Sequence, residues 1–173
     1  MPSASPTPSQ EKAQVITDGR HAEADIMDII HNARKFLNIW GDSCIPEFIL
    51  SETIRSALEQ AKRTGVRIRC ITEITKNNLN YCKELIKFAE IRHLNKIVGN
   101  SMTSDKEHLA QSVGHSFASK LVYTNEYKMV VQQNYIFENL WNNSTTHNDK
   151  ISTLELGIDL EELKVLSDPN EIR

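Results

Sequence analysis

Long apolar segments are missing from this sequence of 173 residues. No apolar run approaches the roughly 20 residues that a helix needs to span a bilayer. The first residues, MPSASPTPSQEK, also lack the apolar centre of a secretory signal. We therefore expect a cytoplasmic protein that does not have a membrane as its partner.

Cysteine is scarce as well. The three cysteines are Cys44, Cys70 and Cys82. An odd number at wide spacing fits neither a disulfide framework nor a pair of zinc ligands, so free and mostly buried thiols are expected. The histidines His93, His108 and His115 also match no common ligand spacing. The sequence therefore predicts no metal and no cofactor.

An excess of basic side chains is the third absence. Lys and Arg number 20 against 23 Asp and Glu, which gives a formal net charge of -3. This balance provides no general attraction to nucleic acid or to an anionic membrane, so neither is expected as a partner, although a local basic patch is not excluded. The hydrophobic share of 39% and the charged share of 25% are ordinary for a soluble globular domain.

The chain is expected to have three parts. Residues 1–13, rich in Pro and Ser, predict a disordered tail, residues 14–145 one domain, and residues 146–173 a C-terminal helix or linker. In the first half, strands and helices alternate by apolar periodicity. Strands are predicted over 13–19, 36–43 and 66–74, and helices over 22–33, 46–64 and 75–89. Strands that are separated by single helices usually lie parallel, which predicts an α/β fold with a mixed, mostly parallel sheet and helices on both faces.

The second half predicts short strands without helices between them, over 90–100, 108–113 and 119–125. A long helix over 125–143 follows, with Asn125 as its cap and an apolar stripe that includes Tyr127 and Trp141. This stripe is interpreted as core, or alternatively as a surface that pairs two copies of the chain. Residues 151–163 predict a further helix or turn, and residues 164–173 an extended piece.

The stretch VGNSMTSDKEHLAQSV has the spacing of a catalytic motif without its catalyst. It resembles the phospholipase D signature, in which a His attacks phosphorus, a Lys two residues later holds the phosphate oxygens, and an Asp follows seven residues after the His. In this chain the three positions hold Val98, Asn100 and Asp105. The resemblance therefore implies a phospholipase D-like half-domain that is not an enzyme, with phosphodiesterase activity as the least favoured function.

Two longer phrases carry a closer resemblance over about residues 14–145. GVRIRCITEITKNNLNYCKELIKFAEIRHLNKIVGN and YTNEYKMVVQQNYIFENLWNNS are similar to the N-terminal, phospholipase D-like sensory module of archaeal signal-transduction histidine kinases. The sequence departs from that pattern at Asn95, Lys96 and Ser101, where the family commonly has Asp, Gly and an aromatic residue. The resemblance implies a noncatalytic input domain for signal transduction, because the kinase's phospho-acceptor box and ATP lid are not present in this sequence.

A second class of function is an effector-binding or dimerisation module like those of archaeal transcription regulators. In either class, a small molecule or a partner domain would bind beyond the carboxyl ends of the parallel strands, where loops converge. Capping and turn formation are the alternative roles for these polar residues. For Glu73 the alternative is a structural ion pair with Arg92 or His93. The candidate binding residues are Asp42, Ser43, Thr72, Glu73, Asn77, Asn78, His93, Asn100 and Asp105.

Overall fold

The computed structural model of the protein describes residues 10–16, 22–111 and 120–157. Its strands are β1 (Ala13–Ile16), β2 (Phe36–Gly41), β3 (Arg67–Thr72), β4 (Glu90–His93), β5 (Asn100–Ser104), β6 (His108–Gln111), β7 (Leu121–Thr124) and β8 (Thr145–Thr146). Its helices are α1 (Ala22–Asn32), α2 (Ile45–Ile49), α3 (Glu52–Arg63), α4 (Leu79–Leu85), α5 (Tyr127–Asn142) and α6 (His147–Leu156). The predicted tail and the extended piece at the C-terminus fall mainly outside the described residues.

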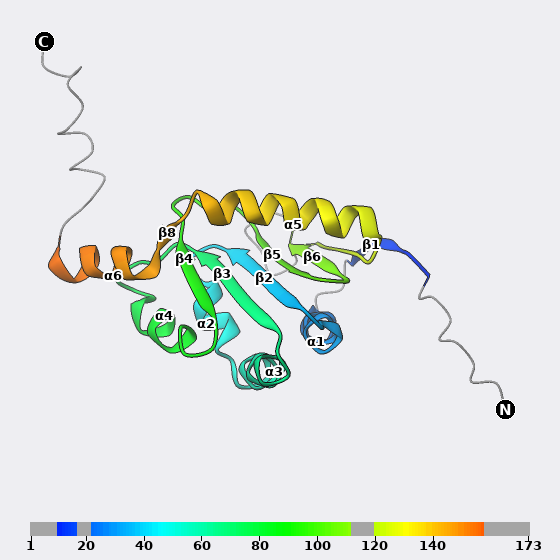
Figure 1. The fold of residues 1–173 in the computed structure, drawn as a ribbon, viewed down its shortest axis with the longest axis horizontal. Coiled ribbons are helices and arrows are strands. Elements are labelled where there is room, and N and C mark those ends of the chain that lie inside the picture. The colour runs from blue at the N-terminus through cyan, green and yellow to red at the C-terminus, as the bar shows by residue number, and fades with distance from the viewer. Residues whose placement is uncertain (1–9, 17–21, 112–119, 158–173) are drawn as a thin grey trace, which may run out of the picture.

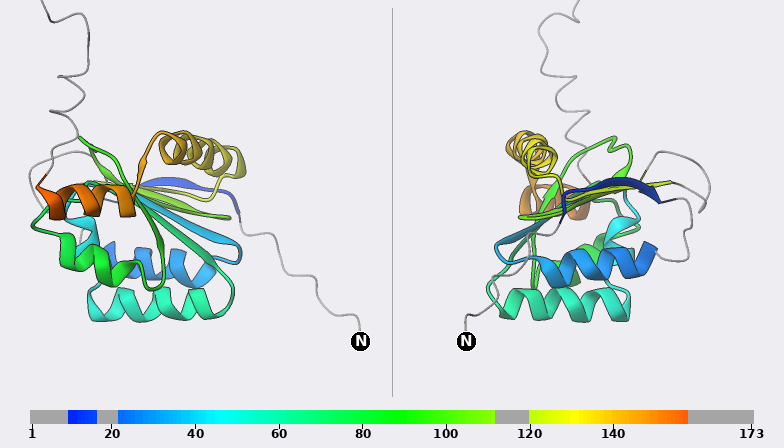
Figure 2. Two further views of the ribbon diagram at one scale, coloured as in Figure 1. Left: turned by 60° about the vertical axis from the view of Figure 1, so that its left-hand side comes forward. Right: turned by 90° about the vertical axis from the view of Figure 1, so that its right-hand side faces the viewer.

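One open sheet of eight strands, in the order β1-β7-β6-β5-β2-β3-β4-β8, organises the described chain (Figure 1). Helices α1 to α4 cover one face and α5 crosses the other (Figure 2). The predicted α/β class, with a mixed sheet and helices on both faces, is confirmed, but the expectation that the sheet is mostly parallel is wrong, because most neighbouring strands pair antiparallel. Parallel pairing joins β2 to β3 and β3 to β4, whereas the other neighbours are antiparallel.

The first strand lies at an unexpected place in this sheet. β1 pairs antiparallel with β7, although α1 alone separates it from β2 in the sequence. The strands β7, β6 and β5 lie between β1 and β2, so β1 and β2 run in the same direction without touching. The connection through α1 therefore crosses to the far edge of the sheet, which local periodicity does not encode.

Two predicted elements are divided in the structure. The helix predicted over 46–64 breaks into α2 and α3 at Ser51, whose extended backbone (φ -56°, ψ 144°) starts the second helix. The strand predicted over 90–100 divides into β4 and β5, which lie on opposite sides of the β2–β3 pair. The turn between them includes Gly99 with φ 88°, a conformation that favours glycine.

The core lies mainly between the sheet and helices α1 to α4. Leu37 and Ile39 of β2 point into it, and Ile29 and Leu58 on the facing helices are fully buried. The amphipathic spacing of α1 and α3 explains this packing, because it places their apolar residues on one side. At the end of α3, Gly65 takes a left-handed conformation with φ 93°.

Helix α5 is held against the other face of the sheet by a small apolar cluster and a buried cation. Phe137 and Trp141 stack with ring centroids 5.7 Å apart. The Arg69 guanidinium lies 4.9 Å from the Phe137 ring and 5.2 Å from the Trp141 ring, and it pairs with Glu138. The predicted cap is wrong, since Glu126 occupies the cap position and Asn125 instead accepts a hydrogen bond from the Lys12 backbone N–H (2.6 Å).

Candidate functional site

The carboxyl ends of the parallel strands bring most of the predicted binding residues together. In the register of the sheet, Gly41 pairs with Thr72 and Thr72 pairs with His93, so the chain leaves β2, β3 and β4 at one edge. The antiparallel strand β5 delivers Asn100 to the same edge, next to Asp42. We call the polar residues at this edge the crescent. Its members are Asp42, Ser43, Thr72, Glu73, Asn77, Asn78, His93 and Asn100.

Asn78 is the centre of the crescent and is 5% exposed. Its side-chain amide donates to the backbone oxygens of Ser43 and Glu73, both at 2.8 Å, and its oxygen accepts from the Thr75 backbone N–H at 2.8 Å. One side chain thus joins the loops that follow β2 and β3. All three bonds serve backbone groups, so Asn78 shapes the crescent and offers no atom to a ligand.

Asn100 and Gly41 meet in a second tight contact. The Asn100 side chain accepts a hydrogen bond from the Asp42 N–H (3.1 Å) and donates one to Gln111 (3.0 Å). A Cβ at Gly41 would lie 2.2 Å from the Asn100 side-chain oxygen and 2.3 Å from Ile45, so only glycine fits. The residue at the position of the phosphate-holding lysine is therefore a structural amide.

Thr72 and His93 also bond to backbone groups. The Thr72 hydroxyl donates to the Asp42 carbonyl at 2.7 Å, and His93 Nδ1 accepts the N–H of Ile74 at 2.9 Å. Both residues are buried. Because Nδ1 acts as an acceptor, the neutral His93 ring carries its proton on Nε2.

Side-chain groups free for a ligand remain at Glu73, Asn77 and Ser43. Among the described residues Glu73 has no ion pair, because His93 bonds to Ile74 and Arg92 points to α5, where it donates to the Trp141 carbonyl (2.7 Å). The alternative role of Glu73, an ion pair with Arg92 or His93, is therefore not among the ion pairs of the described residues. Asn77 is exposed and Glu73 half-buried. The neighbouring Asp42 carboxylate accepts from the Cys44 N–H at 2.9 Å, in the turn that begins α2.

Asp105 does not belong to the crescent. It lies in the turn between β5 and β6, at the amino ends of the parallel strands, since Leu37 near the start of β2 pairs with Ser104. Its carboxylate accepts the backbone N–H groups of Arg34 (2.8 Å) and Lys35 (3.0 Å). Burial acts to raise the pKa of Asp105, but these backbone hydrogen bonds outweigh it and the pKa is lowered. Grouping Asp105 with the other candidates was wrong, because β5 carries it to the opposite edge.

Val98, which the sequence resemblance places at the nucleophile position of the phospholipase D signature, is 65% exposed. It lies in the turn before β5, one residue ahead of Gly99. An isopropyl group cannot attack phosphorus or accept a proton. The three motif positions therefore hold an inert side chain, an amide bonded within the protein and a distant carboxylate.

The remaining sulfur and imidazole groups do not converge. Cys70 and Cys82 are buried free thiols and Cys44 is exposed, as the scarcity of cysteine predicted. Burial raises the pKa of Cys82 to about 11. His93 on β4 and His108 on β6 have three strands between them, and His115 lies outside the described residues. No group of metal-binding side chains is found in the described part of the chain.

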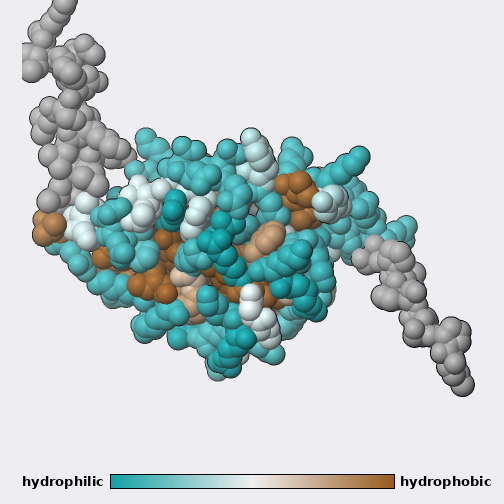
Figure 3. All heavy atoms as spheres, viewed as in Figure 1, coloured by the Kyte–Doolittle hydropathy of each residue, from teal (hydrophilic) through white to brown (hydrophobic). Residues whose placement is uncertain are grey.

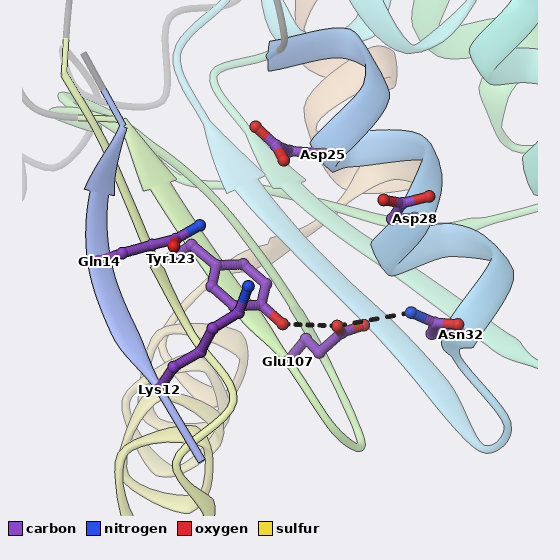
Figure 4. A pocket seen from close by; sticks show the side chains of 7 residues that line it. All are labelled: Lys12, Gln14, Asp25, Asp28, Asn32, Glu107 and Tyr123. Carbon is purple, nitrogen blue, oxygen red and sulfur yellow. Dashed lines mark hydrogen bonds between the residues drawn. The ribbon is translucent and has the colours of Figure 1, made fainter. Parts of the chain in front are cut away.

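A polar pocket of about 190 Å³, missed in the sequence, lies between α1 and the β1 edge of the sheet (Figure 4). Asp25 and Asp28 project from α1 toward the Tyr123 ring, whose hydroxyl donates to Glu107 at 2.7 Å. The Lys12 ammonium lies 5.0 Å from the centre of that ring. No local signal could have found this pocket, because it depends on β1 pairing with β7.

Comparisons with known proteins show the fold. No family model matches the sequence, and no curated protein matches it significantly. Among solved structures, the phospholipase D family member Nuc from Salmonella typhimurium is 14% identical with a TM-score of 0.63, covering 80% of this chain and 99% of Nuc. NucT from Helicobacter pylori is 14% identical with a TM-score of 0.62, covering 79% of this chain and 99% of NucT. The chain has a phospholipase D-like fold.

A third similar structure is TrmBL2, an archaeal chromatin protein described with a novel mode of DNA binding. It is 16% identical with a TM-score of 0.64, and the match covers 81% of this chain but 55% of TrmBL2. This similarity corrects the expectation that nucleic acid is not a partner. A DNA-binding protein contains this fold, so a net charge of -3 does not exclude nucleic acid. Within the described residues, no helix is long and apolar enough to cross a bilayer.

Proposed function

We propose that this protein is a noncatalytic, phospholipase D-like effector-binding module of the kind that archaeal transcription regulators contain. The observation that carries the proposal is the state of the motif strand. Val98 has replaced the nucleophile, and both polar groups of the Asn100 side chain bond to the protein itself, at Asp42 and Gln111. What the scaffold retains is a set of rigid loops at the strand ends, which suits recognition better than phosphodiester chemistry.

The proposed ligand surface is the exposed part of the crescent. Glu73 is half-buried and Asn77 is exposed on the loop between β3 and α4, and Asn78 ties this loop to the loop after β2, so their positions are set before a ligand arrives. A carboxylate and an amide on one loop fit a neutral polar ligand with several hydroxyl or amino groups, such as a sugar. A ligand that contacts both loops would couple the ends of β2 and β3, and its effect would depend on preferring one arrangement of those loops.

A thermal-shift screen of sugars, phosphorylated metabolites and nucleotides tests this function. We expect a compound that raises the melting temperature of the wild-type protein and loses that effect with Glu73→Gln. Glu84→Gln, on α4 outside the crescent, is the matched control and should respond like the wild type. Turnover of a chromogenic phosphodiester by the purified protein would refute the noncatalytic assignment.

A second setting for such a module is the input domain of a histidine kinase, and the two phrases that resemble those sensors support it. In both settings a ligand at the crescent would act on the C-terminal helices, since α6 follows directly from β8 and β8 pairs with β4. Residues His93 and Thr145 are partners in that pairing. The same ligand screen, repeated on a longer chain that includes an output domain, separates kinase control from control of DNA binding.

A dimerisation module is the second candidate function, and the outer surface of α5 favours it. Tyr127, Val131 and Tyr135 follow one another at intervals of four and are 70%, 48% and 70% exposed. Figure 3 shows apolar side chains over the N-terminal half of this helix. The stripe is symmetric about Val131, so two antiparallel copies of α5 would place each tyrosine against the partner's tyrosine.

Oligomeric state tests this candidate directly. If α5 pairs two copies, sedimentation of the wild type should show a concentration-dependent dimer, and Val131→Glu should leave a monomer. Gln132→Glu, at an exposed position on the same helix about 100° around from Val131, should still dimerise. A wild-type monomer at all concentrations would refute the candidate.

A further inference from the structure

Basic side chains gather at the amino ends of the parallel strands, the edge of the sheet opposite the crescent. Lys35 precedes β2, Lys62 lies in the last turn of α3, and Lys106 lies in the turn between β5 and β6. All three residues are exposed. Figure 1 shows the ends of α1 and α3, the starts of β2 and β3 and the β5–β6 turn along this one edge. We call these three lysines the basic edge.

Hydrogen bonds between backbone segments fix the basic edge. The Arg67 N–H donates to the Lys35 carbonyl at 3.0 Å, which ties the start of β3 to the start of β2. The Asp105 carboxylate accepts from the N–H groups of Arg34 and Lys35, which ties the β5–β6 turn to the same segment. Lys35 and Lys106 therefore project from segments that are tied to each other, and Lys62 lies in the last turn of the helix that leads into β3.

The carboxylates near this edge are already engaged. Glu90 accepts two hydrogen bonds from Arg67 at 2.6 and 2.8 Å, and Glu59 pairs with Arg63 at 3.6 Å. Over the described ranges, no carboxylate lies within 4.0 Å of the ammonium groups of the basic edge. Asp105 and Glu90 act on these lysines only at longer range. The edge is thus positive in a chain whose net charge is negative.

Helix polarity does not account for the whole cluster. Lys62 lies at the C-terminus of α3, where a cation is favoured by the helix dipole. Lys35 and Lys106 lie outside helices, so their placement has no such cause. Lysines at spaced points on one edge suit a ligand that carries repeated negative charges.

We propose that the basic edge binds the phosphate backbone of a nucleic acid, an inference that rests on the proposed relation to modules of DNA-associated regulators. An anionic membrane fits less well. None of the large apolar side chains exposed in the described residues lies within 34–36, 62–67 or 105–107, and stable adsorption to a bilayer needs apolar burial beside the charge. In Figure 3 the surface over the ends of α1 and α3 is hydrophilic.

The polar pocket beside α1 determines the direction in which the nucleic-acid backbone would run along this surface. Asp28 and Glu107 line that pocket, and Glu107 follows Lys106 in the sequence. A phosphate chain would be repelled from the α1 side and drawn toward α3. Neutralising Asp28, an exposed residue of the pocket wall, should therefore strengthen binding about two- to threefold.

Fluorescence anisotropy with a labelled duplex of about 20 base pairs tests the proposal on the full chain. We expect wild-type binding whose logarithmic salt dependence has a slope of about -2 to -3, because each phosphate contact contributes about -0.9. The triple variant K35E/K62E/K106E should bind at least about tenfold more weakly than the matched variant K76E/K120E/K128E. The matched variant makes the same change in net charge at exposed lysines outside the edge.

Three results would overturn the proposal. They are equal loss of binding in the two triple variants, no binding by the wild type to duplex or single-stranded nucleic acid, and binding to phosphatidylserine vesicles in place of nucleic acid. The melting temperature of each variant checks its folding, and K35Q/K62Q/K106Q replaces the charge reversal if that variant is unfolded. Effector binding at the crescent is measured separately, so failure of this inference and failure of the proposed function are distinguishable.

Discussion

The two ends of the parallel strands use their polar residues in opposite ways. At the carboxyl ends, the short side chains of Asn78, Asn100 and Thr72 fold back onto backbone groups and hold the loops together. At the amino ends, the three lysines of the basic edge are exposed to solvent, and the Asp105 carboxylate bonds to the backbone. The comparison teaches that a polar residue at a strand end indicates a ligand site only when its side chain is not needed to satisfy the loop itself.

Among substitutions at the two strand ends, removal of the Asn78 side-chain amide should cause the largest loss of stability. Asn78→Ala leaves the Ser43 and Glu73 carbonyls and the Thr75 N–H without their partner, and we expect a loss of about 3 kcal/mol in the free energy of unfolding. Chemical denaturation measures it. Asn77→Ala, at an exposed neighbour, should change stability by less than about 0.5 kcal/mol. Similar values for the two variants would show that Asn78 does not hold the crescent.

Lowering the pH should reduce the stability of the folded protein through His108, the first residue of β6. Burial lowers the pKa of His108 to about 4, and its Nδ1 lies 2.8 Å from the Thr103 hydroxyl. The unfolded chain takes up a proton near pH 6.5 and the folded chain near pH 4, so stability is present above pH 6.5 and is lost as the pH falls toward 4. We expect a loss on the order of 2–3 kcal/mol between these values.

His108→Gln should remove most of that pH dependence, because the amide does not titrate. His31→Gln, at an exposed position at the end of α1, is the control and should keep the wild-type profile. Denaturation curves at pH 7, 5.5 and 4 measure the effect. An unchanged slope in His108→Gln would show that other groups carry the acid sensitivity.

Loss of the Asp105 carboxylate should have an intermediate effect. Asp105→Ala leaves the N–H groups of Arg34 and Lys35 without an acceptor in the protein, and we expect a loss of about 1.5 kcal/mol. Asp105→Asn should lose less, since its amide oxygen still accepts. Neither variant should alter a ligand response at the crescent. A ligand response that disappears with unchanged stability would return Asp105 to the binding site.

Glu73→Gln should have the smallest effect on stability, within about 0.5 kcal/mol, because the carboxylate has no ion pair in the described structure. Its effect should be confined to ligand recognition. A large loss of stability in this variant, measured by the same denaturation curves, would place Glu73 with Asn78 among the structural residues of the crescent.

Much of the fold could be predicted because it depends on local periodicity. The spacing of Ile26, Ile29 and Ile30 encodes the buried side of α1, and the branched residues of RIRCIT encode β3. The edge of the sheet at which Asp42, Thr72 and His93 lie could also be predicted, since parallel strands end together. The position of Asp105 could not, because it depends on the direction of β5, which follows from its antiparallel pairing with β2.

The sequence by itself determined the alternation of elements, the free thiols and the aliphatic side chain at Val98, because each is a property of single residues or of their periodic spacing. Only the tertiary structure decided which polar groups remain available. Asn78 and Asn100 find backbone partners 35 and 58 residues away, and the lysines of the basic edge come together from three elements. These are long-range pairings in space, and a residue's type and near neighbours do not specify them.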